Sequence, residues 1–352
     1  MKFHILLVRF SSMGDVVLQT ATINWLRALY GQNLRLTFIT SKEFASLLSA
    51  HPGLDQVITY DRRGESWKDL ITKIDTEEEQ HPIDLILDLH ATLRSFRLRF
   101  SYWTTPSLTV DKRRWERFLL TKLKGKFFKR LVNEKIFGLE PQVERIIKDL
   151  ESIFADHRGV RRTKEFRQGH MGELTSLSSG EVYSLPRPYL VLAPSASFGP
   201  KRWPIQHFVE LTKRLLEKTD FDLVILAGPE DKFCEAFNQL SSPRLHNLQG
   251  KTSLKESMNI LQRAQASIGN DSGMNHIAEA HGVPCLTIFG PTDPRFGFAP
   301  HGEKSRYISK ELWCKPCSTT GKSPCFRAEL FCMNLITPDE VLKTFEEMGV
   351  KV

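Results

Sequence analysis

Short apolar runs that alternate with longer helix-period stretches constrain the fold of this 352-residue chain more than any other feature. The stretches between the runs, such as Asp15–Tyr30 and Ile205–Lys218, carry apolar residues at helical spacing. Because parallel strands need helical crossovers, the alternation predicts an α/β fold with parallel sheets covered by helices. The predicted strands are Phe3–Arg9, Leu34–Thr40, Gln56–Tyr60, Leu85–Leu89, Tyr189–Ala193, Leu223–Ala227, Leu245–Leu248, Ala266–Gly269 and Pro284–Phe289.

Two such strand-and-helix sets are separated by polar residues between His157 and Pro188, a stretch with four glycines and no sustained period. This composition is typical of a linker, and the length of the chain exceeds one ordinary domain. We therefore predict an N-terminal domain over 1–168, a linker over 169–188 and a C-terminal domain over 189–352. The last helix, 337–352, is a candidate to pack back on the first domain. The two halves favour two Rossmann-like domains facing a central cleft, with ligands at the carboxyl ends of the strands.

Positive charge is concentrated between Lys112 and Lys135, where ten Lys or Arg residues stand against two acids in a chain of net charge +8. Apolar residues interleave with these charges, which fits a solvated amphipathic helix or attachment to an anionic membrane surface. RNA binding competes with these interpretations, but no nucleic-acid motif accompanies the segment, so we expect no nucleic-acid partner. No apolar stretch approaches the ~20 residues of a membrane span, and we find no secretory signal, which favours the cytoplasm.

The segment Ser11-Ser12-Met13-Gly14-Asp15 follows the first predicted strand and opens a helix. Gly14 lets a ligand approach the backbone, and amides at a helix start favour anions. Asp15 is either a first-turn carboxylate that stabilises the helix or a general base at the strand end. Because the segment is neither G-x-G-x-x-G nor a Walker loop, nicotinamide-binding and P-loop functions lose their usual support.

A second strand-to-helix junction, Gly269–His276, combines small, polar and imidazole groups. Ser272 and Gly273 can offer backbone amides to a phosphate at the helix start, where the dipole also favours an anion. His276 follows about one turn into the helix. A capped helix with a satisfied histidine is the alternative interpretation.

The loop Pro194–Pro204 delivers two cations, Lys201 and Arg202, just before another predicted helix. Two cations beside a helix start suit a diphosphate, although a lone lysine is often only a surface charge. Trp203 either anchors this loop or stacks on a base.

Basic side chains also follow two strands of the first domain. His90 and Arg94 come after Leu85–Leu89, and Arg62 and Arg63, with Lys68 beyond them, come after Gln56–Tyr60. Arginine is the usual choice for phosphate or carboxylate recognition, so these residues are candidate acceptor contacts. Ordinary surface charge is the alternative for each of them.

Four of the six cysteines, Cys314, Cys317, Cys325 and Cys332, follow the pattern C-x2-C-x7-C-x6-C. In a cytosolic protein this favours a structural zinc site over disulfides. The second and third spacings are not those of a standard zinc finger. The alternatives are reduced cysteines that serve only as packing residues, or redox-sensitive thiols. We expect the cluster to lie outside the reaction centre.

These motifs resemble the lipopolysaccharide heptosyltransferase family (ADP-heptose transferases, glycosyltransferase family 9). The most specific parts are Ser11–Asp15 and Asp271–His276, supported by Lys201–Pro204, Asp88–Ser95 and the cysteine group. The resemblance implies a GT-B fold whose first domain binds the acceptor and whose second binds the donor. It further implies ADP-L-glycero-D-manno-heptose as donor and the phosphorylated Kdo-lipid A inner core as acceptor, at the cytoplasmic face of the inner membrane.

The resemblance also implies roles for individual residues. The catalytic aspartate falls on Asp15 and the diphosphate-contacting lysine on Lys201. The ribose-binding acid falls on Glu230, with Asp231 as its rival. The remaining donor-site residues implied are Ser12, Gly14, Asp271, Ser272, Gly273 and His276.

The expected chemistry is transfer with inversion. Lys201 and the helix start at Gly273 would stabilise negative charge on the leaving diphosphate without a metal, while Asp15 removes the proton of the acceptor hydroxyl. The D-x-D segment Asp220–Asp222 precedes a strand, at the sheet end away from the cleft, and is interpreted as a turn. We therefore expect no required cofactor, with a structural zinc as the one candidate metal. The alternatives are a GT-B transferase of another nucleotide sugar and a non-catalytic module that binds RNA or lipid.

Overall fold

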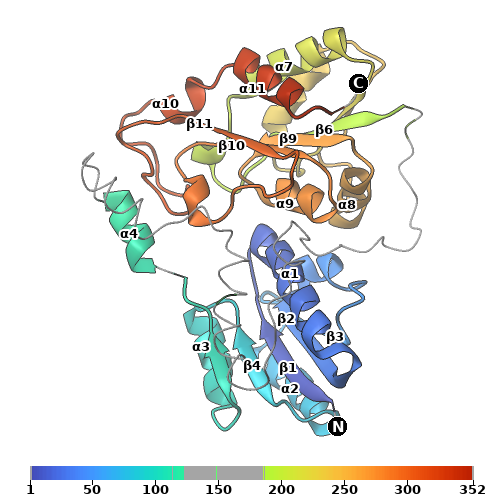
Figure 1. The fold of residues 1–352 in the computed structure, drawn as a ribbon, viewed down its shortest axis with the longest axis vertical. Helices are drawn as coiled ribbons and strands as arrows, with labels where there is room; N and C mark the ends of the chain where they lie inside the picture. The colour runs from blue at the N-terminus through green and yellow to red at the C-terminus, as the bar shows by residue number, and fades with distance from the viewer. Residues whose placement is uncertain (1, 113, 123–147, 149–184, 186, 351–352) are drawn as a thin grey trace. The chain divides into compact units, whose positions relative to one another are not determined.

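A computed structural model of the protein describes residues 2–112, 114–122, 148, 185 and 187–350 (Figure 1). Residue contacts divide them into two units. Unit 1 holds 2–112 and 148, and unit 2 holds 114–122, 185 and 187–350. No helix among the described residues is long and apolar enough to cross a membrane.

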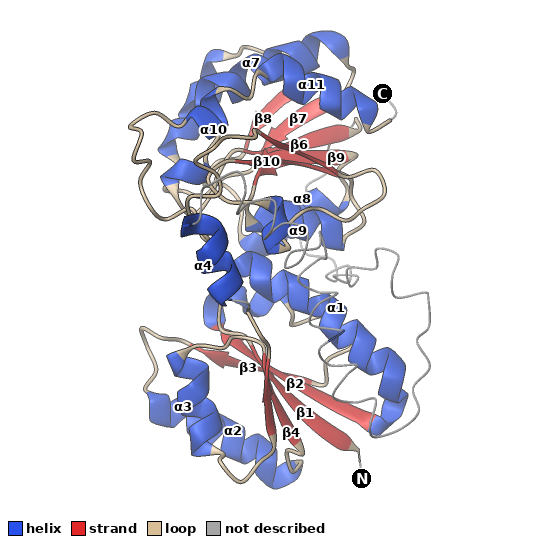
Figure 2. Ribbon diagram, turned by 60° about the vertical axis from the view of Figure 1, so that its left-hand side comes forward, coloured by secondary structure: helices blue, strands red, loops and turns tan. Residues whose placement is uncertain are grey.

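Unit 1 is built on a sheet of five parallel strands in the order β3-β2-β1-β4-β5. Figure 2 shows α1 on one face of this sheet and α2 and α3 on the other. Ser12 and Asp15 form a capping box that starts α1, and Ser66 and Asp69 do the same for α2. The elements are β1 (Phe3–Val8), α1 (Met13–Tyr30), the 3-10 helix η1 (Gly31–Asn33), β2 (Leu34–Ser41), the 3-10 helix η2 (Lys42–Leu47), β3 (Gln56–Tyr60), α2 (Trp67–Gln80), β4 (Leu85–Asp88), α3 (Leu93–Ser101) and β5 (Ser107–Thr109).

Unit 2 has a second parallel sheet, of six strands in the order β11-β10-β9-β6-β7-β8. Figures 1 and 2 show α7 and α11 on one face and α8 and α9 on the other. The elements are α4 (Arg114–Lys122), β6 (Tyr189–Ala193), η4 (Gly199–Lys201), α7 (Ile205–Lys218), β7 (Asp222–Ile225), η5 (Lys232–Gln239), β8 (Leu245–Asn247), α8 (Leu254–Gln262), β9 (Ala266–Asn270), α9 (Gly273–Ala280), β10 (Cys285–Phe289), η6 (Pro294–Phe296), β11 (Arg306–Ser309), α10 (Phe331–Asn334) and α11 (Pro338–Glu347).

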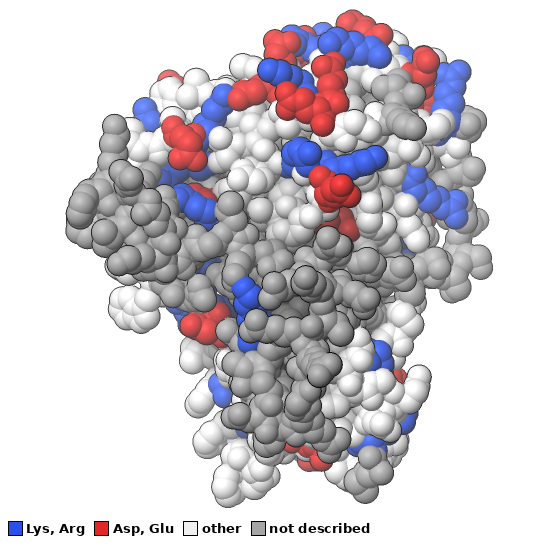
Figure 3. Space-filling model, in the orientation of Figure 1, with Lys and Arg blue, Asp and Glu red and all other residues white. Residues whose placement is uncertain are grey.

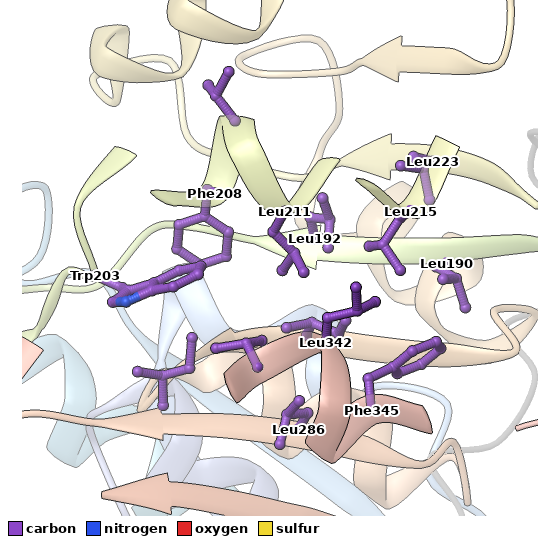
Figure 4. Packing of buried hydrophobic residues seen from close by; sticks show 14 of the residues in the cluster. Leu190, Leu192, Trp203, Phe208, Leu211, Leu215, Leu223, Leu286, Leu342 and Phe345 are labelled. Carbon is purple, nitrogen blue, oxygen red and sulfur yellow. The ribbon is translucent and has the colours of Figure 1, made fainter. Parts of the chain in front are cut away.

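The core of unit 2 joins the sheet to α7 and α11 (Figure 4). Leu192 and Leu223 from the strands meet Phe208 from α7 and Phe345 from α11, and all four side chains are buried. The last helix, a candidate to pack on the first domain, therefore buries its apolar face in unit 2. Thr337 caps α11 and Pro338 occupies its first turn.

Helix α4 groups with unit 2, although the predicted first domain includes its residues. Leu120 is buried beside Phe296, and the Nη2 atom of Arg117 donates a hydrogen bond to the carbonyl oxygen of Phe296 at 3.1 Å. Most of the predicted linker and most of the basic segment lie outside the described residues. The domain boundaries of 168 and 188 therefore stay predictions.

Candidate active site

Asp15 lies in the first turn of α1, at the carboxyl end of β1, and its side chain is 17% exposed. Its Oδ2 atom accepts hydrogen bonds from the hydroxyl of Ser12 at 2.8 Å and from the backbone N–H of Ser12 at 3.3 Å. The guanidinium of Arg9 contacts the same oxygen at 2.5 Å. Among the described residues, no hydrogen-bond donor reaches the second oxygen, Oδ1. Asp15 thus caps the helix through one oxygen, and the other has no donor among the described residues.

The neighbours of Asp15 keep its carboxylate ionised. Burial raises the pKa of Asp15, but the charge of Arg9 and the hydrogen bonds from Ser12 outweigh burial and hold the pKa below its usual value. A carboxylate in this state is charged at neutral pH and can accept a proton.

Arg9 is a further candidate site residue that the sequence motifs do not include. It is 3% exposed, and its Nη1 atom donates a hydrogen bond to the carbonyl oxygen of Leu89 at 2.5 Å while Nη2 contacts Asp15. Arg9 directly follows an apolar strand run, and a cation there is rarely buried without a partner. This position in the sequence is the signal that could have identified Arg9.

The predicted acceptor residues gather at the carboxyl edge of the unit 1 sheet. His90 follows β4, and its ring packs edge-on against the Phe10 ring with the two ring centres 5.6 Å apart. The guanidinium of Arg94 lies 5.4 Å from the centre of the Phe10 ring. Burial, together with the charge of Arg9, lowers the pKa of His90 to about 3, so the imidazole is neutral. Its Nδ1 atom is buried and has no hydrogen-bond partner in the described part of the chain.

Arg62 and Arg63 lie in the turn after β3 and are exposed, and neither forms an ion pair with a described residue. The ring of Tyr60, the last residue of β3, contacts the Phe10 ring at 6.1 Å. This contact ties the end of β3 to the end of β1.

In unit 2, Lys201 and Asp271, two of the donor-site residues that the resemblance implies, lie side by side. Lys201 ends the 3-10 helix after β6, Asp271 follows β9, and the Nζ atom of Lys201 lies 2.8 Å from Oδ2 of Asp271. The two side chains are 15% and 7% exposed. The hydroxyl of Thr292 donates a hydrogen bond to the same carboxylate oxygen at 2.8 Å. A partly accessible ammonium is therefore fixed beside the start of α9.

The start of α9 retains unused hydrogen-bonding capacity. Ser272 is the N-cap residue, and its Oγ atom is buried without a partner among the described residues. Gly273 begins the helix, so its amide and those of the next two residues have no carbonyl of the helix to bind. His276 lies in the second turn, 8% exposed, with its ring 6.2 Å from that of Phe298. Unpaired donors at a helix start form an anion site.

Backbone packing fixes this junction. The side chain of Asn270 donates to the carbonyl oxygen of Pro194 at 2.6 Å and accepts from the backbone N–H of Trp203 at 3.0 Å, which joins the Lys201 loop to β9. A methyl group at Gly269 would lie 2.8 Å from the carbonyl oxygen of Ala193, so only glycine fits there. Trp203 itself is 2% exposed and acts as the anchor of the loop.

The structure separates the two candidate ribose-binding acids. Asp231 is 5% exposed and bound on three sides, by the hydroxyl of Ser195 at 2.5 Å, the backbone N–H of Gly228 at 3.0 Å and the guanidinium of Arg202 at 3.3 Å. Glu230 is exposed in the turn that follows β7. Asp231 is therefore structural, and Glu230 is the carboxylate that a ligand can reach. Arg202, predicted beside Lys201 as a second phosphate contact, is engaged with Asp231.

The four predicted zinc ligands, Cys314, Cys317, Cys325 and Cys332, line one small pocket with Pro200 and Pro291, and none of these four forms a disulfide bond in the described part of the chain. In the described ranges, no three His, Cys, Asp or Glu side chains are placed to hold one metal ion. The arrangement therefore does not fit a zinc ion, and zinc stays a prediction without support from the geometry.

The segment between Cys317 and Cys325 contacts Lys201, nearer to the candidate site than the sequence indicates. Gly321 has a φ of +79°, and a methyl group at this position would overlap the side-chain stem of Lys201. The backbone N–H of Cys317 donates to the carbonyl oxygen of Pro291 at 3.1 Å, next to Thr292. The segment therefore covers the lysine and supports the loop that holds Asp271.

The D-x-D segment lies where the sequence places it. Asp222 is the first residue of β7, at the amino end of the strand, and its Oδ2 atom lies 3.1 Å from the Nε2 atom of His246. Lys201 and Asp271 follow the carboxyl ends of their strands, so this carboxylate belongs to the opposite edge of the sheet.

The sequence is similar to those of known proteins. A family model described as glycosyltransferase family 9 (heptosyltransferase) matches residues 83–324. Lipopolysaccharide heptosyltransferase 2 of Escherichia coli is 33% identical over 181 residues, covering 47% of this chain and 50% of that protein. The matched chain thus spans about half the length of that relative. Lipopolysaccharide heptosyltransferase 1 of Pseudomonas aeruginosa is 24% identical over 337 residues, covering 89% of this chain and 86% of that protein.

The fold has a solved counterpart. The structure of Escherichia coli ADP-heptose LPS heptosyltransferase II matches with a TM-score of 0.68 at 22% identity, covering 99% of this chain and 98% of that one. This likeness confirms the predicted GT-B fold of two Rossmann-like units. Because the family model covers more than half of the chain, the protein belongs to glycosyltransferase family 9, the heptosyltransferase family.

Proposed function

We propose that the protein transfers a heptose from ADP-L-glycero-D-manno-heptose to the phosphorylated inner core of lipopolysaccharide, with inversion at the anomeric carbon. The observation that carries the proposal is the anion site at the start of α9, where the ammonium of Lys201 and the unpartnered hydroxyl of Ser272 accompany free helix amides. Relatives named as lipopolysaccharide heptosyltransferases support the choice of sugar and acceptor.

Unit 2 would bind the donor. Lys201 and the amides at Ser272 and Gly273 are suited to the diphosphate, because a cation and a helix dipole both favour its charge. Glu230 would accept hydrogen bonds from the ribose hydroxyls, since it is the exposed acid in the turn after β7, the strand beside β6. As the glycosidic bond breaks, negative charge grows on the leaving phosphate, and these fixed donors stabilise it.

Unit 1 would bind the acceptor and supply the base. The free Oδ1 atom of Asp15 can accept the proton of the attacking hydroxyl, while Arg9 and Ser12 hold the carboxylate through Oδ2. Arg62 and Arg63 are exposed cations suited to the phosphates of the acceptor core, and Arg94 borders the same sheet edge.

We further propose that the transfer requires no metal. Lys201 and the helix start supply the positive charge that a metal would otherwise provide, and the one D-x-D segment lies at the opposite edge of its sheet. The lipid-linked acceptor would bring the protein to the cytoplasmic face of the inner membrane as a peripheral protein.

The test is a mass-spectrometric transfer assay with ADP-heptose and truncated core lipids. Asp15→Asn should lower the transfer rate by about 10²–10⁴-fold, because the amide cannot accept the proton, while ADP binding to unit 2 stays unchanged. Asp69→Asn is the matched control, since Asp69 holds the equivalent position in the capping box of α2. Full turnover by the Asp15 variant would exclude the role of base. Tighter binding of UDP, GDP or CDP than of ADP would instead indicate another nucleotide sugar.

A further inference from the structure

Helix α3 in unit 1 carries a row of large apolar side chains on its solvent side. Leu93 is 88% exposed, Phe96 54% and Phe100 71%, and Trp103, in the turn after the helix, is 80% exposed. The spacings of three, four and three residues place them along one side of the helix. We call these four residues the α3 stripe.

The stripe is not needed for the core of unit 1. The other side of α3 already packs inward, because Ser95 and Leu98 are buried, and Leu98 and Tyr102 belong to a core cluster with Leu70 of α2. Single exposed apolar residues are ordinary, but a continuous row of them marks a surface that contacts a partner.

The segment that carries the stripe is basic, and the nearest acids, Asp88 and Asp75, are already bound to Arg99 and Tyr102. Between His90 and Val110 the sequence has three arginines and no Asp or Glu. By helical geometry Arg97 falls on one side of the stripe and Arg99 on the other. Arg97 is exposed, with its guanidinium 4.8 Å from the centre of the Trp67 ring, whereas Arg99 is half-buried and contacts Asp88. On the visible face of unit 2, by contrast, acidic and basic side chains are interspersed (Figure 3).

We propose that the α3 stripe docks unit 1 on the surface of an anionic phospholipid membrane. Phe96 and Phe100 would enter the boundary between headgroups and acyl chains, and Trp103 would take the interfacial position that tryptophan prefers. Arg97 would remain at headgroup level, where its charge is attracted to anionic lipid. An apolar row bordered by arginines fits this partner better than it fits a nucleic acid, whose charge offers nothing to the apolar side chains.

The stripe begins at the candidate acceptor site. Leu93 is the first residue of α3, and its neighbour Arg94 lies over Phe10 at the carboxyl edge of the sheet. A membrane held against the stripe would therefore adjoin His90 and Arg94, where a lipid-linked acceptor would need to arrive. This alignment rests on the proposed function, whereas the docking itself does not.

Vesicle flotation without any sugar substrate tests the docking, so its result is independent of the transfer assay. The probes are vesicles of phosphatidylglycerol with phosphatidylethanolamine and vesicles of phosphatidylcholine alone. Combining Phe100→Ser with Trp103→Ser should weaken binding to the anionic vesicles by at least about tenfold, because two interfacial side chains are lost. Arg97→Gln should weaken the same binding by about fivefold, and neutral vesicles should bind the wild type poorly.

The matched control combines Tyr307→Ser with Leu335→Ser, two exposed apolar residues of unit 2 that are 41% and 47% exposed, and it should bind like the wild type. Light scattering and thermal unfolding of each variant are measured alongside. Absent vesicle binding by the wild type, or equal loss in the control pair, overturns the proposal. So does a wild-type dimer that the stripe variant converts to monomer, since a second copy would then be the partner.

Discussion

Replacing Lys201 by methionine tests the donor site most directly, because methionine keeps the stem under Gly321 and removes the ammonium. A charge-assisted hydrogen bond to a phosphate contributes about 1.5–3 kcal/mol, and an ammonium has three donors, so Lys201 can keep Asp271 and still bind phosphate. ADP binding should therefore weaken by about tenfold to a hundredfold. Folding should also weaken, by about 1–2 kcal/mol, less than for a fully buried pair because Lys201 is 15% exposed.

A second substitution separates these two effects. Asp271→Asn, added to Lys201→Met, keeps an acceptor for Thr292 and removes the buried unpaired charge, so urea unfolding should recover most of the lost stability. Calorimetric ADP affinity should not recover, since the cation is still missing. Lys213→Met, at an exposed position of α7, is the control for lost charge. Equal ADP affinities in the Lys201 and Lys213 variants would refute the phosphate contact.

Three further predictions follow from the described contacts. Asp231→Asn should destabilise unit 2 in urea without a specific effect on ribose binding. Glu230→Gln should leave stability unchanged and weaken the binding of ADP more than the binding of a ribose-free diphosphate. The reverse pattern would exchange the roles of the two acids. Burial raises the pKa of Glu279 from 4.5 to about 7, so between these pH values the folded protein keeps a proton that the unfolded chain loses. The free energy of unfolding should therefore fall by about 3 kcal/mol as the pH rises from 4.5 to 7. Glu279→Gln should flatten that dependence, and an unchanged slope would contradict it. Trp203→Phe should lower the unfolding free energy by about 1–3 kcal/mol, because the carbonyl oxygen of Ile336 loses its buried donor at 2.9 Å; an unchanged urea midpoint would show that the hydrogen bond contributes little.

Elements with one clear period could be predicted from the sequence. The predicted ranges Gln56–Tyr60 and Ile205–Lys218 coincide with β3 and α7. Helix α3 was missed because its apolar residues fall on both sides, one facing the core and one forming the stripe, so neither a helical nor a strand pattern dominates. The edge strands β5 and β11 were missed because they are short and half-exposed.

The site was predictable where its residues follow strand ends. Parallel strands bring their carboxyl ends to one edge, so Asp15 with His90, and Lys201 with Asp271, could be expected to gather within their own sheets. Contacts from other loops could not be expected. The side-chain stem of Lys201 packs under Gly321. The segment around Gly321 stood out in the sequence only because its cysteines are candidate zinc ligands. No local pattern reports a contact between loops so far apart in the chain.

The ion pair between Arg9 and Asp15 also bears on how the proposed reaction would proceed. A carboxylate whose pKa is held below its usual value is a weak base, which would be a poor choice if it had to deprotonate a hydroxyl before attack. In transfer through an oxocarbenium-like transition state, however, the sugar carbon is strongly electrophilic before the new bond is complete. The attacking hydroxyl then becomes acidic only as it bonds, and a weak base that stays charged is sufficient to receive its proton. Arg9 would therefore keep Asp15 charged and oriented. It also makes Asp15 a weaker base, but a proton transfer this late does not require a strong one.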